Sequence, residues 1–329
     1  MRNAVIAGSG MHVPEKIVTN QFFNEILGED VDTWLRENLT IRERRWCGED
    51  ESTADLCVKA AVRILENAKV KAEEIDLLII ATDTPEYVSP STASVVQYRI
   101  GAKNAGTFDL NTACAGFVTG LDVASKFIKA DERYNNVLVI GAYAMSKFLD
   151  LKDKKTVTLF ADGAAGVLVK STEKQDKGYL ISRLHTEGEY AGWMGIYAGG
   201  THKPLTQEVL NRKDQLLKFV KKFPKEVNPT VWTRMIKESC AGAGMQPKDI
   251  AHYFFTQINI NTIWETLDNL SVERERGYTI MDRYGYTGSA CIPMAFDEAM
   301  KAGKVKEGDL VCFMGSGGGL SFANAIFMM

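Results

Sequence analysis

The sequence predicts an α/β fold built from two similar halves. A continuous apolar run at residues 77–81 follows a short polar segment, a pattern typical of a buried strand that comes after a helix. The pattern recurs 175 residues later, and two further segments match at the same or nearly the same offset. The matched pairs are residues 71–76 with 246–251, 121–124 with 296–299, and 137–141 with 310–315. Strands that alternate with helices in both copies favour an α/β architecture.

The repeat predicts how the chain is divided. Each unit has the order helix, strand, helix, strand, helix, strand, so we expect an N-terminal half at residues 1–175 and a C-terminal half at residues 176–329. The halves should pack as pseudo-twofold copies. Residues 187–222 lie outside the repeated register and are predicted to form an inserted cap. Apolar residues and lysines alternate at 216–222, which predicts an amphipathic helix that guides an anionic carrier or only faces solvent.

Composition excludes several classes of protein. The chain has 329 residues, 45% of them hydrophobic, so it can bury a large core. A net charge of −3 with mixed signs argues against a nucleic-acid surface. No signal-peptide pattern and no run of about 18 apolar residues occurs, so we expect a cytoplasmic protein without a membrane span. The six cysteines form no CxxC pair and, with four histidines, show no zinc-site spacing, so no metal is expected.

Cys114 is the candidate nucleophile. A strand predicted at residues 108–110 turns directly into a helix, which places Cys114 at a helix N-terminus. Unpaired N–H groups and the helix dipole favour a thiolate there, so we expect a lowered pKa. Small residues on both sides leave room for a substrate, although a buried cysteine is otherwise commonly inert packing. The equivalent position in the second half is Ser289, so only one half carries a thiol.

A glycine-rich segment at residues 315–319 directly follows a predicted strand. Glycines let backbone N–H groups approach a ligand oxygen closely. The segment lacks the Gly-Lys-Ser/Thr of a phosphate-binding loop and does not fit GxGxxG. An oxyanion site beside Cys114 therefore fits better, and a tight turn near the C-terminus is the alternative.

Several motifs occur in order over nearly the whole chain: IRER at 41–44, ACAGF at 113–117, FADGAAGVLV at 160–169 and GSGGG at 315–319. Together they resemble the 3-oxoacyl-acyl-carrier-protein synthase III family of the thiolase superfamily. The resemblance implies a five-layer αβαβα thiolase fold, usually in a homodimer. It also implies an acyltransferase of fatty-acid or polyketide-like synthesis in which Cys114 accepts an acyl group from acyl-CoA or acyl-carrier protein, with no permanently bound cofactor.

The resemblance assigns further positions. The N–H groups of Cys114 and Gly318 match the oxyanion hole of the family. Trp34 matches a residue that stacks on the coenzyme adenine, and Asn259 matches an asparagine near the pantetheine arm. Asn38 stands where the family has a basic residue near the coenzyme phosphate.

The carrier-protein surface also departs from the family. Asn261 stands where the family has a basic residue that meets the acyl carrier protein. Carrier docking is therefore expected to be weaker or to use another surface.

Two catalytic residues of the family are replaced. Thr256 stands at the position of its histidine and Tyr286 at the position of its asparagine, with matching neighbours on both sides. In the family these residues hold the malonyl carbonyl oxygen while carbon dioxide leaves. Threonine cannot act as a base near neutral pH, and tyrosine does so only with a greatly lowered pKa. We therefore expect impaired decarboxylative condensation, while acyl transfer onto Cys114 persists.

Another base is needed if carbon–carbon bond formation persists. Asp83 and Glu86 follow the strand at residues 77–81, on a loop where related thiolase-fold enzymes place a catalytic acid. Asp83 is the first candidate and Glu86 the second. A carboxylate that caps a turn or faces water is the alternative for either.

Two main functions remain open. The first is an enzyme that acylates itself at Cys114 and passes the acyl group to a carbon, oxygen or nitrogen nucleophile. The second is a catalytically impaired subunit that forms a heterodimer with an intact paralogue. A hydrolase ranks last, because no histidine is placed to activate water.

Overall fold

The computed structural model describes residues 2–329, and two β-sheets organise the chain. The first sheet has parallel strands at one side and antiparallel strands at the other. Its strands in spatial order are β1 (Asn3–His12), β7 (Asp162–Thr172), β6 (Asn136–Ala144), β4 (Leu77–Ala81) and β5 (Gly106–Leu110). All five residues of β4 are buried, which explains its unbroken apolar sequence.

The second sheet repeats this order. Its strands are β8 (Gly178–Thr186), β13 (Ser321–Met328), β12 (Leu310–Gly317) and β11 (His252–Phe255). They correspond in position and direction to β1, β7, β6 and β4, while β5 has no counterpart in this sheet. The predicted duplication of elements is therefore visible in the topology.

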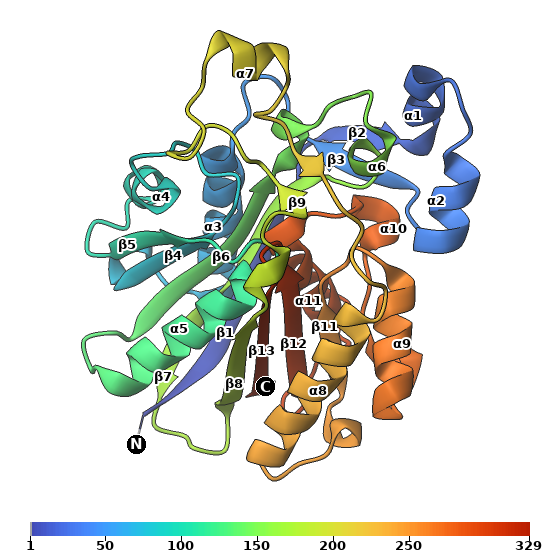
Figure 1. The fold of residues 1–329 in the computed structure, drawn as a ribbon. Helices are drawn as coiled ribbons and strands as arrows, with labels where there is room; N and C mark the ends of the chain where they lie inside the picture. The colour runs from blue at the N-terminus through green and yellow to red at the C-terminus, as the bar shows by residue number, and fades with distance from the viewer. Residues whose placement is uncertain (1) are drawn as a thin grey trace.

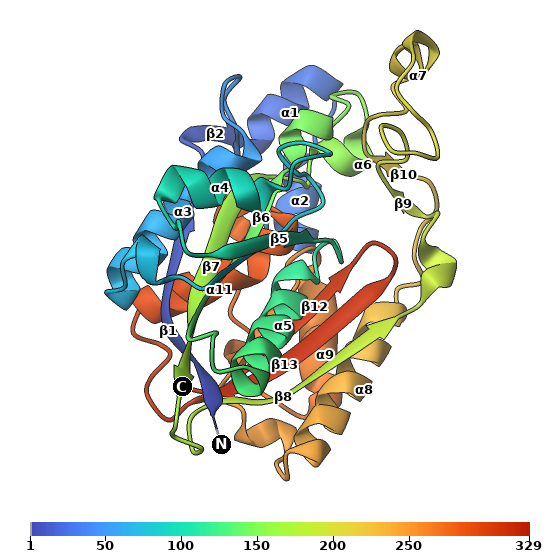
Figure 2. The same cartoon turned by 90° about the vertical axis from the view of Figure 1, so that its left-hand side faces the viewer.

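Helices complete five layers (Figures 1 and 2). Between the sheets lie α5 (Gly116–Ala130) and α11 (Cys291–Lys301). The outer face of the first sheet is covered by α3 (Thr53–Ala68) and α4 (Thr92–Ile100), and that of the second by α8 (Val227–Gly242) and α9 (Ile260–Leu270). The predicted αβαβα layering is confirmed.

Buried carboxylates fasten the central helices to the sheets in a reciprocal way. Asp122 of α5 accepts a hydrogen bond from Ser182 of β8, in the second sheet. Asp297 of α11 accepts one from Ser9 of β1, in the first sheet, at 2.8 Å. Each carboxylate also pairs with a lysine one turn further along its own helix. These contacts give both buried charges the partners that they need.

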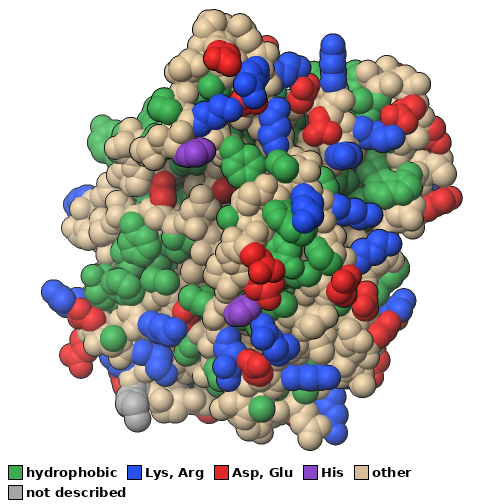
Figure 3. Space-filling view, viewed as in Figure 1, with side chains coloured by type: hydrophobic (Ala, Val, Ile, Leu, Met, Phe, Trp, Pro, Cys, Tyr) green, Lys and Arg blue, Asp and Glu red, His purple; other side chains and the backbone are tan. Residues whose placement is uncertain are grey.

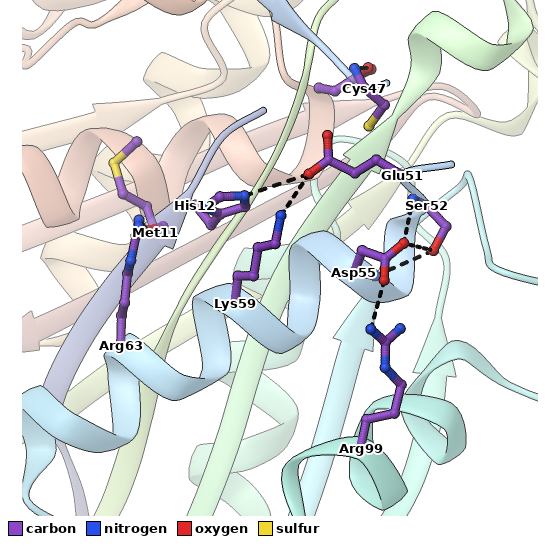
Figure 4. Close-up of polar contacts among 10 residues, drawn as sticks. Met11, His12, Cys47, Glu51, Ser52, Asp55, Lys59, Arg63 and Arg99 are labelled. Carbon is purple, nitrogen blue, oxygen red and sulfur yellow. Dashed lines mark hydrogen bonds and ion pairs between the residues drawn. The ribbon is translucent and has the colours of Figure 1, made fainter. Parts of the chain in front are cut away.

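Polar contacts fix the start of α3, as Figure 4 shows. The Ser52 hydroxyl accepts from the Asp55 N–H, and the Asp55 carboxylate accepts from the Ser52 N–H at 2.8 Å, which forms a capping box. Asp55 also pairs with Arg99 of α4 at 2.6 Å. Glu51 pairs with Lys59, in the second turn of α3, at 3.0 Å. The two outer helices are thereby held together above the first sheet.

Smaller elements flank the layers. A two-stranded ribbon pairs β2 (Lys16–Thr19) with β3 (Glu43–Trp46). The short or peripheral helices are α1 (Asn20–Leu27), α2 (Asp32–Leu39), α6 (Lys154–Val157), α7 (Gln207–Asn211) and α10 (Met281–Tyr284).

The region expected to form a cap stands out from the body, with α7 at its tip (Figure 2). The predicted amphipathic helix at residues 216–222 is wrong. This segment contains β10 (Lys218–Phe219), which pairs antiparallel with β9 (Met194–Gly195). Leu217 is buried and donates its N–H to the carbonyl of Phe148 at 2.8 Å. Only two of its seven residues form a strand, and Val220 is exposed, so the pattern of apolar and basic residues does not correspond to one buried helical face.

Charges of both signs are interspersed over the face shown in Figure 3. Within residues 2–329, no helix combines the length and the apolar character needed to cross a bilayer.

Candidate active site

Cys114 lies in the turn between β5 and α5, immediately before the helix begins at Gly116. The turn is closed by backbone hydrogen bonds from Ala115 N–H to the Thr112 carbonyl at 3.1 Å and from Gly116 N–H to the Ala113 carbonyl at 2.9 Å. Cys114 is only 3% exposed. The predicted placement at the start of a helix is confirmed.

The pKa of the Cys114 thiol differs from the expectation. Burial raises it well above its ordinary value, and the nearby charge of Asp83 raises it further. A hydrogen bond with the Tyr286 hydroxyl acts in the opposite direction. The predicted lowering was wrong, because removal from water has the largest effect on the pKa of this thiol. Cys114 is thus a neutral thiol at rest, and its reaction requires a group that accepts its proton.

The glycine loop packs directly against the turn of Cys114. A Cβ atom on Gly317 would lie 2.5 Å from the Cys114 nitrogen and 2.6 Å from the Thr112 carbonyl oxygen. Glycine is therefore required for β12 to reach this turn. The next residue, Gly318, stands beside Ala113, since a Cβ on it would be 3.9 Å from the Ala113 Cβ. The two segments that the sequence singled out are thus neighbours.

A pocket of about 240 Å³ opens beside Cys114. Residues from the ends of β4, β5 and β6, from the glycine loop and from the cap surround it. The lining residues are Asp83, Asn111, Ala113, Cys114, Tyr143, Met145, Ala191, Met194, Gly195, Ile196, Tyr197, Leu217, Gly318 and Gly319. Three of the predicted site residues, Asp83, Cys114 and Gly318, therefore share one pocket.

Asp83 is the one charged side chain among the described residues that line the pocket. It follows β4 directly, and burial raises the pKa of its carboxyl to about 6. Its Oδ1 atom is shielded from solvent and has no hydrogen-bond partner among the described residues. Its charge influences both Cys114 and Tyr143. An unpaired acceptor that is half ionised near pH 6 has the properties of a general base.

Glu86, the second candidate, is used elsewhere. Its Oε2 accepts from the Ala54 N–H at 2.9 Å and so caps the first turn of α3. Its own N–H is bonded to the Thr92 hydroxyl at 3.0 Å. Of the two carboxylates on this loop, Asp83 borders the pocket, and Glu86 fastens the loop to α3.

Tyr286 is buried next to the thiol. Its hydroxyl interacts with Cys114 and lowers the pKa of that thiol, and its ring lies 5.4 Å from that of Phe160. Burial raises the pKa of Tyr286 well above its ordinary value, so it stays a neutral phenol that can donate to sulfur. Its backbone N–H is held by the Leu159 carbonyl at 2.9 Å.

Thr256 is oriented away from this chemistry. Its hydroxyl accepts from the Ser316 N–H at 2.8 Å and donates to the Ser316 carbonyl at 3.2 Å. Its one proton is therefore already bound to the backbone of β12. Thr256 is 1% exposed and is absent from the lining of the pocket.

Sequence reasoning missed two groups near the thiol. Tyr143 lies at the carboxyl end of β6 and lines the pocket beside Asp83. Its place in a central parallel strand next to β4 could have indicated it, since parallel strands end at the same edge of a sheet. Cys291 at the start of α11 is a second thiol whose charge affects Cys114, and its sulfur accepts from the Gln257 N–H at 3.4 Å.

The residues expected to meet the coenzyme lie on α2 and at the start of α9. Trp34 on α2 is 55% exposed. Asn259 caps α9 by accepting from the Asn261 N–H at 3.0 Å, and the Asn261 amide donates to the Asn38 carbonyl of α2 at 3.0 Å. The structure thus brings the two helices together at the surface, outside the lining of the Cys114 pocket.

Comparisons with known proteins agree with this geometry. Two family models match the chain: 3-oxoacyl-[acyl-carrier-protein] synthase III over residues 108–188 and its C-terminal counterpart over residues 240–329. The chain is 34% identical to β-ketoacyl-[acyl-carrier-protein] synthase III of Fusobacterium nucleatum, over 99% of the chain and 98% of that protein.

Solved structures extend the similarity. The crystal structure of 3-oxoacyl-[acyl-carrier-protein] synthase III from Aquifex aeolicus matches with a TM-score of 0.90 and 31% identity, covering 99% of this chain and all of that one. The priming β-ketosynthase of the R1128 polyketide pathway matches with a TM-score of 0.87 and 25% identity, covering 99% and 96%. The predicted thiolase fold is thereby confirmed.

Proposed function

Because the chain belongs to the 3-oxoacyl-[acyl-carrier-protein] synthase III family of acyltransferases, we propose that Cys114 takes an acyl group from an acyl-CoA or acyl-carrier-protein thioester. The enzyme then passes this group to an acceptor in fatty-acid or polyketide-like biosynthesis. The observation that carries the proposal is the meeting of Cys114, Asp83 and Gly318 in one pocket.

Acylation begins when the Cys114 sulfur attacks the thioester carbonyl. Asp83 accepts the thiol proton, because a carboxyl with a pKa of about 6 is mostly ionised at neutral pH. The N–H groups of Cys114 and Gly318 hold the oxyanion of the tetrahedral intermediate. As the carbon–sulfur bond to the donor breaks, the proton passes to the departing sulfur. The acyl group is then joined to Cys114.

The remaining predicted residues have supporting roles. Tyr286 donates to the Cys114 sulfur and stabilises it as negative charge develops. Thr256 holds the strand that leads into the glycine loop, through both of its hydrogen bonds to Ser316. Trp34 offers an exposed aromatic face for the coenzyme adenine, and Asn259 marks the path of the pantetheine arm.

We further propose that decarboxylative condensation is slow or lost. That reaction needs two hydrogen-bond donors for the enolate oxygen of the extender unit. The Thr256 hydroxyl is bound to Ser316, and the Tyr286 hydroxyl is bound to Cys114. Loss of one such donor costs about 10²- to 10³-fold in rate.

A second candidate function is a catalytically impaired subunit paired with an intact paralogue in place of a homodimer. Two observations favour it: burial raises the pKa of Cys114, and Thr256 is fully engaged with the backbone. A subunit of this kind would not need a nucleophile beside a glycine loop.

Intact-mass measurement separates the two functions. The purified protein is incubated with acetyl-, butyryl- and octanoyl-CoA and with acyl-loaded carrier protein. We expect a mass increase that survives in Cys291→Ala, whose thiol is the other one at the site, and disappears in Cys114→Ala. If the wild type gains no adduct from any donor, the acyltransferase proposal fails and the subunit function stands.

A further inference from the structure

The pocket beside Cys114 holds a single charged side chain. Asp83 provides it, and none of the described lining residues is a lysine, arginine or histidine. Two other polar groups already have partners: Asn111 Oδ1 accepts from the Ala113 N–H at 2.9 Å, and the Tyr197 hydroxyl donates to the Ala191 carbonyl at 3.1 Å. The unpaired Oδ1 of Asp83 is thus the strongest unused acceptor in the pocket.

This arrangement disfavours an acidic acceptor. A malonyl group carries a carboxylate, which would enter a site that has no lining cation and already contains the Asp83 charge. Like charges repel strongly at short range in a water-poor pocket. Thr256 and Tyr286 also disfavour a malonyl acceptor, since they stand in place of the enolate-binding groups that the family uses.

An amine is also a poor match. A protonated amine would pair with the Asp83 carboxylate, and this pairing would raise the pKa of the amine. The nitrogen is not a nucleophile while it holds that proton. A hydroxyl group is neutral, so it can donate one hydrogen bond to Oδ1 and transfer the same proton as it attacks.

We propose that the acyl acceptor is a neutral alcohol, that Asp83 is its general base, and that the product is an ester. This inference rests on the proposed function, because it begins from Cys114 in its acylated form. The walls contributed by the cap, including Met194, Ile196 and Leu217, suit an alcohol whose body is apolar.

The transfer balances without any further reactant. The alcohol oxygen forms a bond to the acyl carbon while its proton moves to Asp83. The carbon–sulfur bond then breaks, and the electron pair stays on the Cys114 sulfur. Asp83 returns the proton to this sulfur, which leaves the neutral thiol and the ionised carboxylate of the resting enzyme. Burial of Cys114 favours this last step, because it disfavours a thiolate leaving group.

The test separates the second half-reaction from the first. The enzyme is acylated with butyryl-CoA, freed of excess donor and mixed with 1-butanol, 1,3-propanediol, phenol, butylamine, malonyl-CoA or buffer alone. Loss of the adduct is followed by intact mass, and the product is identified by mass spectrometry. We expect at least one alcohol to discharge the enzyme faster than buffer and to yield an ester.

Asp83→Asn should accept the acyl group more slowly, because Asp83 also takes the Cys114 proton, so it is loaded to completion by longer incubation before the second step. The loaded variant should then discharge to the alcohol about 100-fold more slowly or worse than the loaded wild type, because general-base catalysis is lost. Near Asp83, Cys114 carries the acyl group and has no proton to lose, and burial keeps Tyr143 neutral in this range, so wild-type discharge should rise with pH through about 6. This rise should be absent in Asp83→Asn. Asp50→Asn, an exposed loop carboxylate, should match the wild type.

Every other outcome contradicts either this inference or the proposed function. Discharge mainly by malonyl-CoA or by butylamine overturns the inference while leaving the proposed function intact. The inference is also overturned if every alcohol discharges the enzyme only at the rate of buffer alone. It is overturned as well if Asp83→Asn transfers the acyl group to the alcohol at the wild-type rate. Absence of any adduct in the first step instead defeats the proposed function itself.

Discussion

The buried Tyr286 phenol lowers the pKa of the Cys114 thiol, although the two residues are far apart in the chain. The phenol is placed next to the sulfur. It opposes the rise in pKa that burial imposes on Cys114.

Replacement of this phenol should slow every reaction of the thiol. In Tyr286→Phe the pKa of Cys114 should rise, and alkylation by iodoacetamide at pH 8 should fall about tenfold, since a hydrogen bond to a charged group contributes about 1.5–3 kcal/mol. The rate is measured by the mass increase at Cys114. Tyr284→Phe, which loses a bond to Glu298 away from the thiol, is the control and should react normally.

Removal of the Thr256 hydroxyl should affect stability more than acylation. Thr256→Val leaves the buried N–H and carbonyl of Ser316 without partners, at a cost of about 1–3 kcal/mol for each group. Urea denaturation should show this loss, while the acylation rate changes only a few-fold. Thr256→Ser keeps both bonds and should behave as the wild type. A normal stability with abolished acylation would assign Thr256 to catalysis instead.

The buried carboxyl of Asp83 should make stability depend on pH. Its pKa in the folded protein is about 6, above the ordinary 3.8, so the folded state binds the proton more tightly than the unfolded state does. The ionised form is therefore destabilising, and this penalty develops as pH rises from about 4 to about 6. Asp83→Asn should be more stable than the wild type at pH 8, by on the order of 2–3 kcal/mol, with no difference near pH 4.

Denaturation midpoints at the two pH values measure this effect. The groups that face Asp83 are Cys114 and Tyr143, which stay neutral over this range because burial raises the pKa of both. Asp50→Asn, on an exposed turn, should show no such gain. A less stable Asp83→Asn at pH 8 would mean that the carboxylate has a stabilising partner.

A side chain at Gly317 should damage the nucleophile's turn. The added Cβ of Gly317→Ala would lie 2.5 Å from the Cys114 nitrogen, so the turn or the strand must move. We expect loss of most acylation and a destabilisation of about 1–3 kcal/mol. Gly192→Ala is the matched control, because no described atom comes within 4 Å of its added Cβ. Equal acylation by both variants would show that the turn tolerates displacement.

Much of the fold was predictable because buried strands can be recognised from a local run of apolar residues. The apolar run of β4 and its echo in β11 lie between helices on both faces, and such strands lose the alternation of polar residues. The prediction for residues 216–222 was wrong because a run of seven residues is too short to establish a helix, and its structure is set by the pairing of β10 with β9, which lies more than 20 residues earlier in the chain. The division of the chain at residue 175 stays a prediction.

The site was predictable where chemistry follows from local position. Cys114 before a helix and the glycines after a strand could both be identified from their neighbours in sequence. The pKa of Cys114 could not, since it depends on burial by segments that come together only in the fold. The hydrogen bonds between Thr256 and Ser316, which is 60 residues away, could not be predicted from the local sequence either. The catalytic roles given to these residues stay predictions.

α5 and α11 are each fastened by a buried carboxylate to the sheet of the other half of the chain, and this limits the order in which the chain can fold. Ser9 and Asp297 are 288 residues apart, so the part of the inner face of the first sheet that α11 covers stays exposed until almost the whole polypeptide has left the ribosome. A nascent chain that ends after β7 would expose the apolar surface that α11 later covers. Synthesis of this protein should therefore depend on chaperones that shield an unfinished sheet, and truncation products should aggregate rather than persist as small stable domains.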